Sequence, residues 1–483
     1  MGDGTGTRAV VLGGSIAGLL AAKELAEAYD EVVIIDRDTL VGVTETRRGC
    51  PQSKHINGLL TGGRMAMERI YPGLTDALLN DPDGIPTGDL GGTVRWYMLG
   101  KQLKQQHADM FCVGPSRPKL EYHIRQRAED VPNISFMERT DILGLEATAD
   151  RSRITGARVQ RQDGDGNPEV IDADLVVDAT GRGSRTPVWL VELGYPEVVE
   201  ERKKIGLGYV TQYYKLKADP YQGDLSINVV AHPDLPRGCI FAKTDGGRVE
   251  MTTYGILGDH PPTDQAGLYE WMDSLGIPEY TDALRDAEPL TEPVAFRFPT
   301  TLRRRYEDMS RFPDGLLVTG DAVTTFNPVY AGGMTVAAKS ALTIGNHLHT
   351  GAAPVPLDYF RDLAHDVVNP QWEMTNTIDL SFPGVEGERS KETKIAHFMM
   401  KRTQIAATRD GKVTAAYMRA AGQVERPETL QRPGMMLRIL LQSLRGQATV
   451  ERKPVTRPVA ALADYRKKAK PKPQARQQQR RAA

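Results

Sequence analysis

A glycine-rich turn near the start of the chain carries residues whose types and spacing suit the binding of a dinucleotide. The turn reads GGSIAG over residues 13–18, and Asp36 follows farther along. Gly13 permits a tight turn, and Gly18 allows a helix to pack closely on a strand. N–H groups at the start of that helix suit a pyrophosphate, and Asp36 is spaced to bind a ribose hydroxyl. Ser15 stands where the usual GxGxxG motif has its second glycine.

The segments around this turn follow the order of a nucleotide-binding unit. Apolar runs over residues 9–12 and 32–35 predict two buried strands, the second ending at Asp36. Between them, residues 16–28 show the apolar periodicity of a helix. This order predicts a βαβ unit, and the alternative is a βαβ unit that binds no nucleotide.

Three arginines are candidates for binding phosphate. Arg47 and Arg48 precede a predicted helix, and Arg117 stands at the start of another. Guanidinium groups bind phosphate oxygens in pairs of hydrogen bonds. The alternative for each arginine is an ordinary solvated surface position. His55 follows the basic pair, and its alternatives are a structural histidine or one that faces a cofactor.

Two later segments add a second glycine-containing half-site. A predicted strand over residues 173–179 leads into Thr180 and Gly181, and a strand over 315–319 leads into Gly320 and Asp321. Ligands of open α/β sheets bind at such strand ends. A glycine pair and a helix over 334–349 follow. Asp321 suits a polyol chain, and two half-sites bracket one long cofactor, which favours FAD over NAD.

Composition and charge narrow the class of protein. The chain has 483 residues, of which 40% are hydrophobic and 25% charged, as in globular proteins. Its net charge of -1 argues against a nucleic-acid partner. Its three cysteines form no CxxC motif, and no Cys, His and acidic residues share a metal-ligand spacing, so we expect a cytoplasmic protein without a metal. We also expect no signal peptide and no transmembrane segment.

The motifs resemble those of the class A flavoprotein monooxygenases, the fold of aromatic hydroxylases and squalene epoxidase. The matching motifs are GGSIAG with Asp36, the Thr180-Gly181 loop, and GDAVTTFNPVYAGGMT at residues 320–335. More narrowly, GCPQSKHINGLL, YPGLTDALL, DLVVDATGRGSR and GDAVTTFNPVYAGGMTVAA resemble the bacterial polyketide epoxidases of polyether ionophore biosynthesis. The resemblance implies an α/β fold: an FAD-binding Rossmann-like domain of the aromatic-hydroxylase type, an inserted, mainly antiparallel β-sheet substrate domain, and C-terminal helices.

The predicted domain bounds follow from changes in the sequence pattern. Short alternating strands dominate residues 206–305, so this segment is the predicted substrate domain, inserted between two parts of the FAD-binding domain at 1–205 and 306–350. Residues 351–462 are predicted to be helical, with breaks at prolines that include Pro370. Residues 463–483 form a basic tail that lacks the apolar side chains needed to fold.

The resemblance also implies which residues hold FAD. They are Gly13, Ser15 and Gly18 at the pyrophosphate, Asp36 at the adenosine ribose, Arg47 or Arg48 with Arg117 along the cofactor, Ile142 at the adenine through its backbone, Gly181, Gly320 and Asp321 at the ribityl and phosphate part, and Pro328, Gly332, Gly333 and Met334 at the flavin ring.

The resemblance places Phe326, Asn327 and Tyr330 beside the site of oxygenation. The predicted sheet domain adds aromatic side chains such as Tyr209 and Phe241, which favour an apolar small-molecule substrate. At strand spacing, such residues are more often part of a core than of a pocket. No catalytic residue is predicted, because an alkene needs no deprotonation before oxygen transfer.

The implied reaction is that of the cofactor. Reduced FAD reacts with O2 to a C4a-hydroperoxide, which transfers one oxygen atom to an alkene and gives an epoxide and water. NAD(P)H is the expected electron donor, directly or through a separate flavin reductase. Thr180 replaces the aspartate of a loop that binds FAD and NADPH in aromatic hydroxylases, and this departure leaves both routes of reduction open.

Three alternative activities remain. One is hydroxylation of an aromatic or enol substrate on the same scaffold, and another is a non-redox cyclisation in which FAD is a structural support. The third is halogenation. Flavin-dependent halogenases carry a WxWxIP motif, and no two of the four tryptophans, Trp96, Trp189, Trp271 and Trp372, have that spacing.

Overall fold

The computed structural model describes residues 6–164 and 166–449. The predicted basic tail at 463–483 lies outside the described residues. No helix within these two ranges combines the length and the apolar character needed to cross a membrane.

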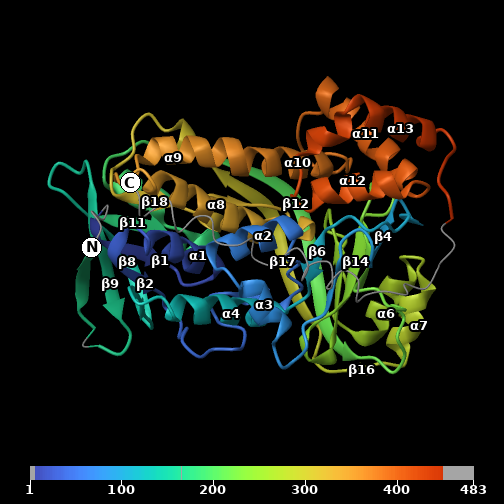
Figure 1. Cartoon of the computed structure of the whole chain (residues 1–483), viewed down its shortest axis with the longest axis horizontal. Helices are drawn as coiled ribbons and strands as arrows, with labels where there is room; N and C mark the ends of the chain where they lie inside the picture. Colours follow the sequence, from blue (N-terminus) through green and yellow to red (C-terminus); the bar gives the residue numbers. More distant parts are fainter. Residues whose placement is uncertain (1–5, 165, 450–483) are drawn as a thin grey trace, which may run out of the picture.

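A parallel five-stranded sheet forms the left half of the molecule in Figure 1, and its strand order is β18-β11-β1-β2-β7. Its strands are β1 (Gly6–Leu12), β2 (Tyr29–Ile35), β7 (Ile134–Met137), β11 (Leu175–Asp178) and β18 (Leu316–Val318). The predicted βαβ unit is confirmed, since β1 and β2 pair in parallel and α1 (Ile16–Leu25) connects them. Strands buried on both faces need the continuous apolar runs seen here.

Helices cover one face of this sheet and a small antiparallel sheet covers the other. The helices of this half are α1, α2 (Thr61–Ile70), α3 (Leu74–Leu79), α4 (Arg117–Glu129), α5 (Thr186–Glu192), α8 (Gly333–Leu348) and α9 (Pro356–Leu363), among which α1 contacts α2, α4 and α8. The small sheet contains β8 (Thr140–Ala147), β9 (Ile154–Arg161) and β10 (Pro168–Asp172). Apolar side chains of β9 and of α8 join the same buried core as β1, so the layers form one unit.

A nine-stranded sheet, mainly antiparallel, forms the other half and has the order β19-β17-β12-β15-β14-β13-β4-β5, with β16 paired to β12. Its strands are β4 (Val94–Met98), β5 (Lys101–Gln102), β12 (Glu200–Lys215), β13 (Ser226–Val229), β14 (Arg237–Lys243), β15 (Val249–Gly255), β16 (Glu288–Pro289), β17 (Val294–Arg304) and β19 (Thr324–Thr325). The sheet therefore extends beyond the predicted insertion. The strands on either side of β4 and β5 in the sequence, β3 (Thr87–Asp89) and β6 (Phe111–Val113), form a separate antiparallel pair.

Helices pack on both faces of this large sheet (Figure 1). The first pair is α6 (Gln265–Asp273) and α7 (Pro278–Arg285), and α6 side chains share a core with β12, β14 and β15. The C-terminal helices are α10 (Asn369–Asp379), α11 (Lys391–Ala407), α12 (Gly411–Ala421) and α13 (Pro433–Ser443). The predicted break at Pro370 is wrong, because α9 continues through one π-turn into α10 and Pro370 lies in its first turn, where a missing N–H is tolerated.

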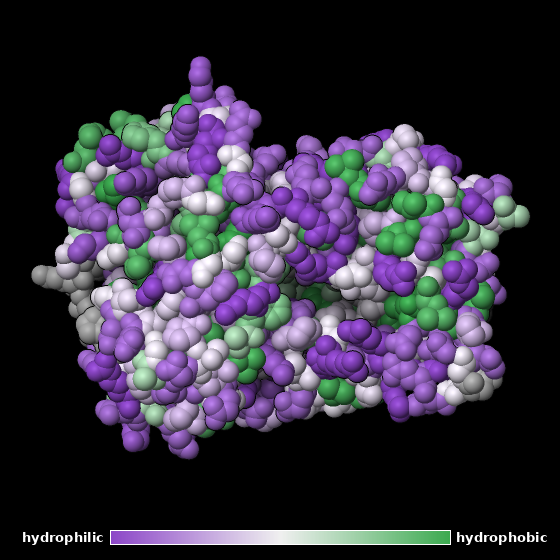
Figure 2. Space-filling model, turned by 180° about the vertical axis from the view of Figure 1, so that it is seen from behind, coloured by the Kyte–Doolittle hydropathy of each residue, from purple (hydrophilic) through white to green (hydrophobic). Residues whose placement is uncertain are grey.

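Several large apolar side chains of α11 and α13 are exposed, among them Ile395, Phe398, Leu437 and Leu441, as is Leu444 directly after α13. Figure 2 shows apolar surface at its upper left, the corner at which these helices lie. Ile395 of α11 also lines a cavity between the helices and the sheet. The C-terminal helices thus carry apolar residues toward that cavity and toward solvent.

Candidate cofactor and substrate site

The turn between β1 and α1 is so tight that two of its glycines have no substitute. Gly13 has a φ of +101°, and a Cβ atom there would lie 2.7 Å from the carbonyl oxygen of Ala179. A Cβ atom on Gly18 would lie 1.8 Å from the carbonyl oxygen of Gly13. The turn and the close helix packing predicted for these glycines are therefore confirmed. The start of α1 is held against the loop that follows β11.

Asp36 at the end of β2 is buried, and it accepts two backbone hydrogen bonds. Gly14 N donates to its Oδ2 at 2.7 Å, and Asp38 N donates to its Oδ1 at 2.8 Å. Burial raises the pKa of the Asp36 carboxyl above its ordinary value, while the two N–H groups and Arg47 lower it. The carboxyl is thus fixed at the tip of β2, next to the glycine-rich turn.

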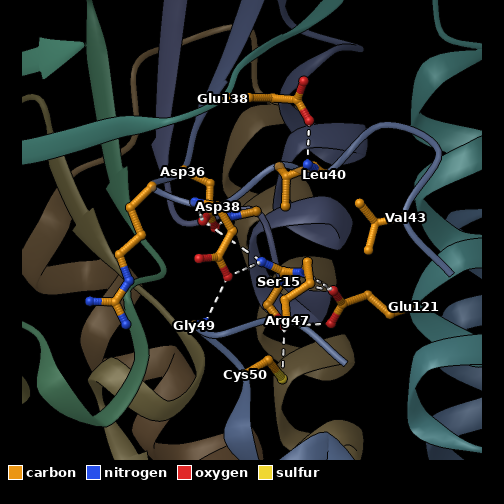
Figure 3. Close-up of polar contacts among 12 residues, drawn as sticks. Ser15, Asp36, Asp38, Leu40, Val43, Arg47, Gly49, Cys50, Glu121 and Glu138 are labelled. Atoms are coloured by element: carbon orange, nitrogen blue, oxygen red, sulfur yellow. Dashed lines mark hydrogen bonds and ion pairs between the residues drawn. The ribbon is translucent and has the colours of Figure 1, made fainter. Parts of the chain in front are cut away.

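A buried charge cluster connects Ser15 to two of the predicted arginines, and Figure 3 shows the part of it formed by Ser15, Arg47 and Glu121. Nε and Nη2 of Arg47 donate to Oε1 of Glu121 at 2.9 and 2.6 Å. The Ser15 hydroxyl donates to Oε2 of the same carboxylate at 2.7 Å, and Arg117 Nη2 donates to Ser15 Oγ at 3.2 Å. Burial raises the pKa of Glu121, but Arg117 and Arg47 outweigh burial and leave that pKa below its ordinary value.

Of the two adjacent arginines, Arg47 is buried in the cluster and Arg48 is exposed. Arg47 Nη1 also donates to Asp38 Oδ2 at 3.1 Å. Sequence reasoning missed Glu121 and Asp38. Glu121 follows Arg117 by one helical turn, a spacing that places both on one helix face and could have indicated the pair.

Ile142 lies on β8, near the tip of β2. Thr140 N, at the start of β8, donates to the carbonyl oxygen of Asp36 at 2.9 Å, so this strand begins beside the residue expected at the ribose. Ile142 itself is half-buried against the core of the parallel sheet. Its expected backbone contact to adenine stays a prediction.

The loop after β11 is fixed by Asp178. Its Oδ1 accepts from the N–H and the hydroxyl of Thr180, at 2.8 and 2.6 Å, and its Oδ2 accepts from the Thr186 hydroxyl at 2.6 Å. Gly181 has a φ of +78°, which only glycine adopts readily. The Thr180 hydroxyl is therefore committed to holding the loop.

Asp321 lies between the glycines of two loops. A Cβ atom on Gly181 would lie 3.9 Å from Asp321 Cβ, and one on Gly333 would lie 3.8 Å from Asp321 Oδ1. The Asp321 side chain reaches solvent, although many protein atoms lie around its carboxyl group. This enclosure raises the pKa of its carboxyl, which Arg117 and then Arg182 lower. Gly320, with a φ of +61°, packs on Ala17 of α1. The second half-site thus approaches the first, as the sequence predicts.

A short segment, residues 328–331, precedes α8 and is held by a buried carboxylate. Asp379 Oδ1 accepts from Asn327 Nδ2 at 3.0 Å and from the Tyr330 hydroxyl at 2.7 Å. Gly332 is buried, and a Cβ atom there would lie 2.5 Å from Nε2 of Gln371, so a side chain would displace Gln371. Met334 is buried in the first turn of α8. Asp379, on α10, was missed because no local pattern connects it to residues 328–331.

A large cavity lies between the nine-stranded sheet and the C-terminal helices. It measures about 1030 Å³. Tyr330, with the rest of segment 328–331, forms part of its wall. The sheet side of the wall is formed by Trp96, Tyr209, Asn228, Ile240, Glu250 and Tyr254. The predicted pocket residues Tyr209 and Tyr330 therefore meet at one cavity.

Three other predicted pocket residues lie outside that wall. Phe241 was predicted on the wrong face of its strand, because its neighbours Ile240 and Ala242 face the cavity while its own ring stacks on Tyr221 at 5.3 Å in the core beneath α6. Phe326 packs in the core 6.2 Å from the ring of Trp372, and Asn327 is buried against Asp379. Both residues directly precede segment 328–331 and anchor it in the protein interior.

His55 is buried between the two halves of the molecule. Its Nδ1 lies 2.9 Å from the Thr211 hydroxyl, and its ring meets that of Tyr209 edge to face at 4.7 Å. Burial lowers the pKa of His55 to about 4, so the imidazole is neutral at pH 7. No group of three His, Cys, Asp or Glu side chains suited to a metal ion occurs within residues 6–164 and 166–449.

Comparison with known proteins identifies a relative of this chain. No protein-family model matches it. Protein Rv3254 of Mycobacterium tuberculosis is 31% identical over 391 residues, which cover 77% of this chain and 80% of that protein. The chain belongs to the family of Protein Rv3254.

Solved structures show the fold. The flavin-dependent brominase Bmp2 superposes with a TM-score of 0.61 at 15% identity, covering 91% of this chain and 100% of that chain. PqsL, a probable FAD-dependent monooxygenase from Pseudomonas aeruginosa, gives a TM-score of 0.58 at 14% identity, covering 78% and 99%. The predicted fold class is confirmed: the chain has the FAD-binding fold that flavoprotein hydroxylases and halogenases share.

Proposed function

We propose that this chain is an FAD-dependent monooxygenase that inserts one oxygen atom from O2 into an apolar substrate, by epoxidation of one or more alkenes of a polyketide or similar secondary metabolite. The observation that carries the proposal is the cavity of about 1030 Å³, whose wall includes residues 328–331. These residues follow Asp321, the acceptor of the second half-site, in the motif that resembles the flavin loop of polyketide epoxidases.

The residues present fit FAD. Arg117 Nε is buried and has no hydrogen-bond partner among the described residues, although the cluster around it is otherwise satisfied. A phosphate oxygen at the start of α1 would complete it. The Asp321 side chain is exposed to solvent beside Gly181 and Gly333, so a polyol chain could reach it. We therefore assign Ser15 and Arg117 to the pyrophosphate, Asp36 to the ribose and Asp321 to the ribityl chain.

The flavin ring is assigned to the segment from Pro328 to Met334. The first turn of α8 offers free N–H groups and a positive dipole there, which favour negative charge on a reduced ring. FAD, when bound and reduced, supplies the activation of O2 and the transfer of one oxygen atom. The chain's own part is to hold an alkene near residues 328–331 and to keep water away.

Two tyrosines and a histidine near this segment are neutral, which favours an alkene over a phenol, and the Asp379 carboxylate is occupied by Asn327 and Tyr330. Burial raises the pKa of both Tyr209 and Tyr254 above the ordinary value and keeps them protonated. His55 is neutral because of its lowered pKa of about 4. Epoxidation requires no deprotonation of the substrate, whereas hydroxylation of a phenol is assisted by a base.

Electrons are expected from NAD(P)H, either directly or from a separate flavin reductase. The Thr180 hydroxyl donates to Asp178 and leaves the loop without the carboxylate of aromatic hydroxylases. Anaerobic reduction of the FAD-loaded protein by NADPH, with and without an added flavin reductase, separates the two routes.

Aerobic turnover of the holoenzyme with NADPH, a flavin reductase and candidate polyenes tests the function. We expect a product heavier by one oxygen atom, with an epoxide and no ring hydroxyl. A ring hydroxyl identifies the alternative hydroxylase. Product formed without O2 or reductant identifies a cyclase, and a brominated product in the presence of bromide identifies a halogenase, the activity named for Bmp2. A purified protein without flavin absorbance contradicts the proposal as a whole.

A further inference from the structure

The sheet wall of the cavity contains one buried carboxyl group, that of Glu250 on β15. Its residue is 3% exposed, yet it lines the cavity. Oε1 of Glu250 has no hydrogen-bond partner among the described residues. A carboxyl oxygen left without a partner at the wall of a cavity is available to a ligand, because an unsatisfied buried polar atom is costly.

The strand register places a tyrosine beside this carboxyl. Tyr213 of β12 is directly opposite Glu250, and the two side chains are hydrogen-bonded. Ala242 of β14 stands opposite Glu250 on the other side and offers no polar group. One oxygen of Glu250 therefore stays free toward the cavity while its position is fixed by Tyr213.

The charged groups around Glu250 leave it neutral. Asp245 and Arg248 are the charges that act on it, and they pair with each other at 2.5 Å. Burial raises the pKa of Glu250 to about 8. Near pH 7 the carboxyl is therefore protonated and serves as a hydrogen-bond donor. A second polar atom on the same wall, Oδ1 of Asn228, also lacks a partner among the described residues.

We propose that the Glu250 carboxyl, positioned by Tyr213, is a polar subsite that binds a carbonyl or hydroxyl oxygen of an otherwise apolar substrate. Tyr254 lies four residues farther along β15 on the same face, and its ring packs in a cluster with Val329 of segment 328–331. Four residues of strand span roughly 13 Å. The subsite thus selects a substrate whose oxygen lies roughly 13 Å from the reacting double bond. This inference rests on the proposed function for the place of the reaction.

Binding to the FAD-loaded protein tests the subsite without turnover. The probes are a long-chain polyene ketone, the polyene hydrocarbon of equal length, and the corresponding primary ammonium ion. Binding is followed by tryptophan fluorescence, to which Trp96 in the cavity wall contributes. We expect the ketone to bind about fivefold to tenfold more tightly than the hydrocarbon, the gain from one hydrogen bond.

Variants assign the preference to Glu250. Glu250→Gln keeps a donor and should keep the preference, whereas Glu250→Leu should abolish it and leave the hydrocarbon affinity unchanged. Glu373→Leu, at an exposed residue of the helical wall, is the matched control and should keep the preference.

Three results overturn the inference: a wild-type protein that binds both uncharged probes equally or binds neither, tighter binding of the ammonium ion, or a preference that survives in Glu250→Leu. If Glu250→Leu fails to fold, the binding of the ketone and the hydrocarbon to the wild-type protein still tests the inference. Flavin absorbance is measured in the same samples. A protein that prefers the ketone but holds no flavin contradicts the proposed function and leaves the subsite intact.

Discussion

Arg47 and Glu121, which are 74 residues apart in the sequence, form a double hydrogen bond at the start of α1, with two guanidinium nitrogens on one carboxylate oxygen. Both side chains are buried. The second oxygen of Glu121 fixes the Ser15 hydroxyl at 2.7 Å. The loop residue that departs from the glycine motif is thus positioned by a long-range charge cluster, and it needs a side chain for that purpose.

Glu121→Gln should destabilise the fold, because it leaves Arg47 and Arg117 buried without a full counter-charge. We expect the free energy of unfolding to fall by about 3 kcal/mol. Urea unfolding followed by circular dichroism measures the change. The control is Glu31→Gln, which breaks an exposed pair with Arg8 and should cost about 0.5 kcal/mol. Equal losses in the two variants would contradict a special role for the buried cluster.

Glu250 should make stability depend on pH. Its pKa is raised from the ordinary 4.5 to about 8 in the folded protein, so the unfolded chain releases this proton first. The favourable contribution of the protonated carboxyl is complete below pH 4.5 and is lost as the pH rises to about 8. Glu250→Gln cannot ionise, so its stability relative to wild type should increase across that range and level off above it. A constant difference in urea midpoints from pH 4.5 to 8 would show that the carboxyl titrates normally.

Asp36→Asn should weaken FAD binding, because a neutral amide is a poorer acceptor for a ribose hydroxyl than a carboxylate. Loss of a charged hydrogen bond predicts an increase in the Kd for FAD of about tenfold to a hundredfold. Titration of the apoprotein with FAD, followed by flavin fluorescence, gives the Kd. Asp30→Asn, at an exposed position of β2, is the control and should leave the affinity unchanged.

Gly18→Ala should not be tolerated, because the added methyl carbon would lie 1.8 Å from the carbonyl oxygen of Gly13. The β1–α1 turn would have to move, at a cost of about 3 kcal/mol or more. Gly434→Ala is the control, since a Cβ atom there meets nothing within 4 Å. Thermal unfolding compares the two. If the two variants were equally stable, the β1–α1 turn could accommodate a Cβ atom at residue 18, and the prediction would be wrong.

Local pattern was enough to predict the nucleotide-binding unit, because the strand, turn, helix and Asp36 lie within one short stretch whose apolar periods and glycines have direct steric reasons. It also predicted the strand end at Gly320 and Asp321, and the structure places Gly320 against Ala17 of α1. The prediction that Phe241 lines the pocket was wrong for a different reason. Alternation tells which residues of β14 share a face, but which face meets α6 and which meets the cavity depends on the packing of distant helices.

The same limit applies to the polar contacts. Asp379 holds Asn327 across 52 residues, and Glu121 holds Arg47 across 74. Neither partner is marked by spacing alone. Glu250 stands in an alternating strand, where a charged residue normally predicts a solvent face. That face becomes a cavity wall because the C-terminal helices pack over it, which the sequence of the strand does not indicate.

Asp379→Ala should loosen the segment expected to hold the flavin ring, because Asn327 and Tyr330 both donate to the carboxylate that it removes. We expect the Kd for FAD to increase about tenfold, as for the loss of buried hydrogen bonds. Asp379→Asn keeps an acceptor oxygen and should lie between wild type and the alanine variant. Asp362→Ala, at an exposed side chain beside His347, is the control. The measurement is FAD titration by flavin fluorescence, with circular dichroism to show that each variant is folded. If the folded alanine variant bound FAD as tightly as wild type, that result would contradict the assignment of the flavin ring to residues 328–331.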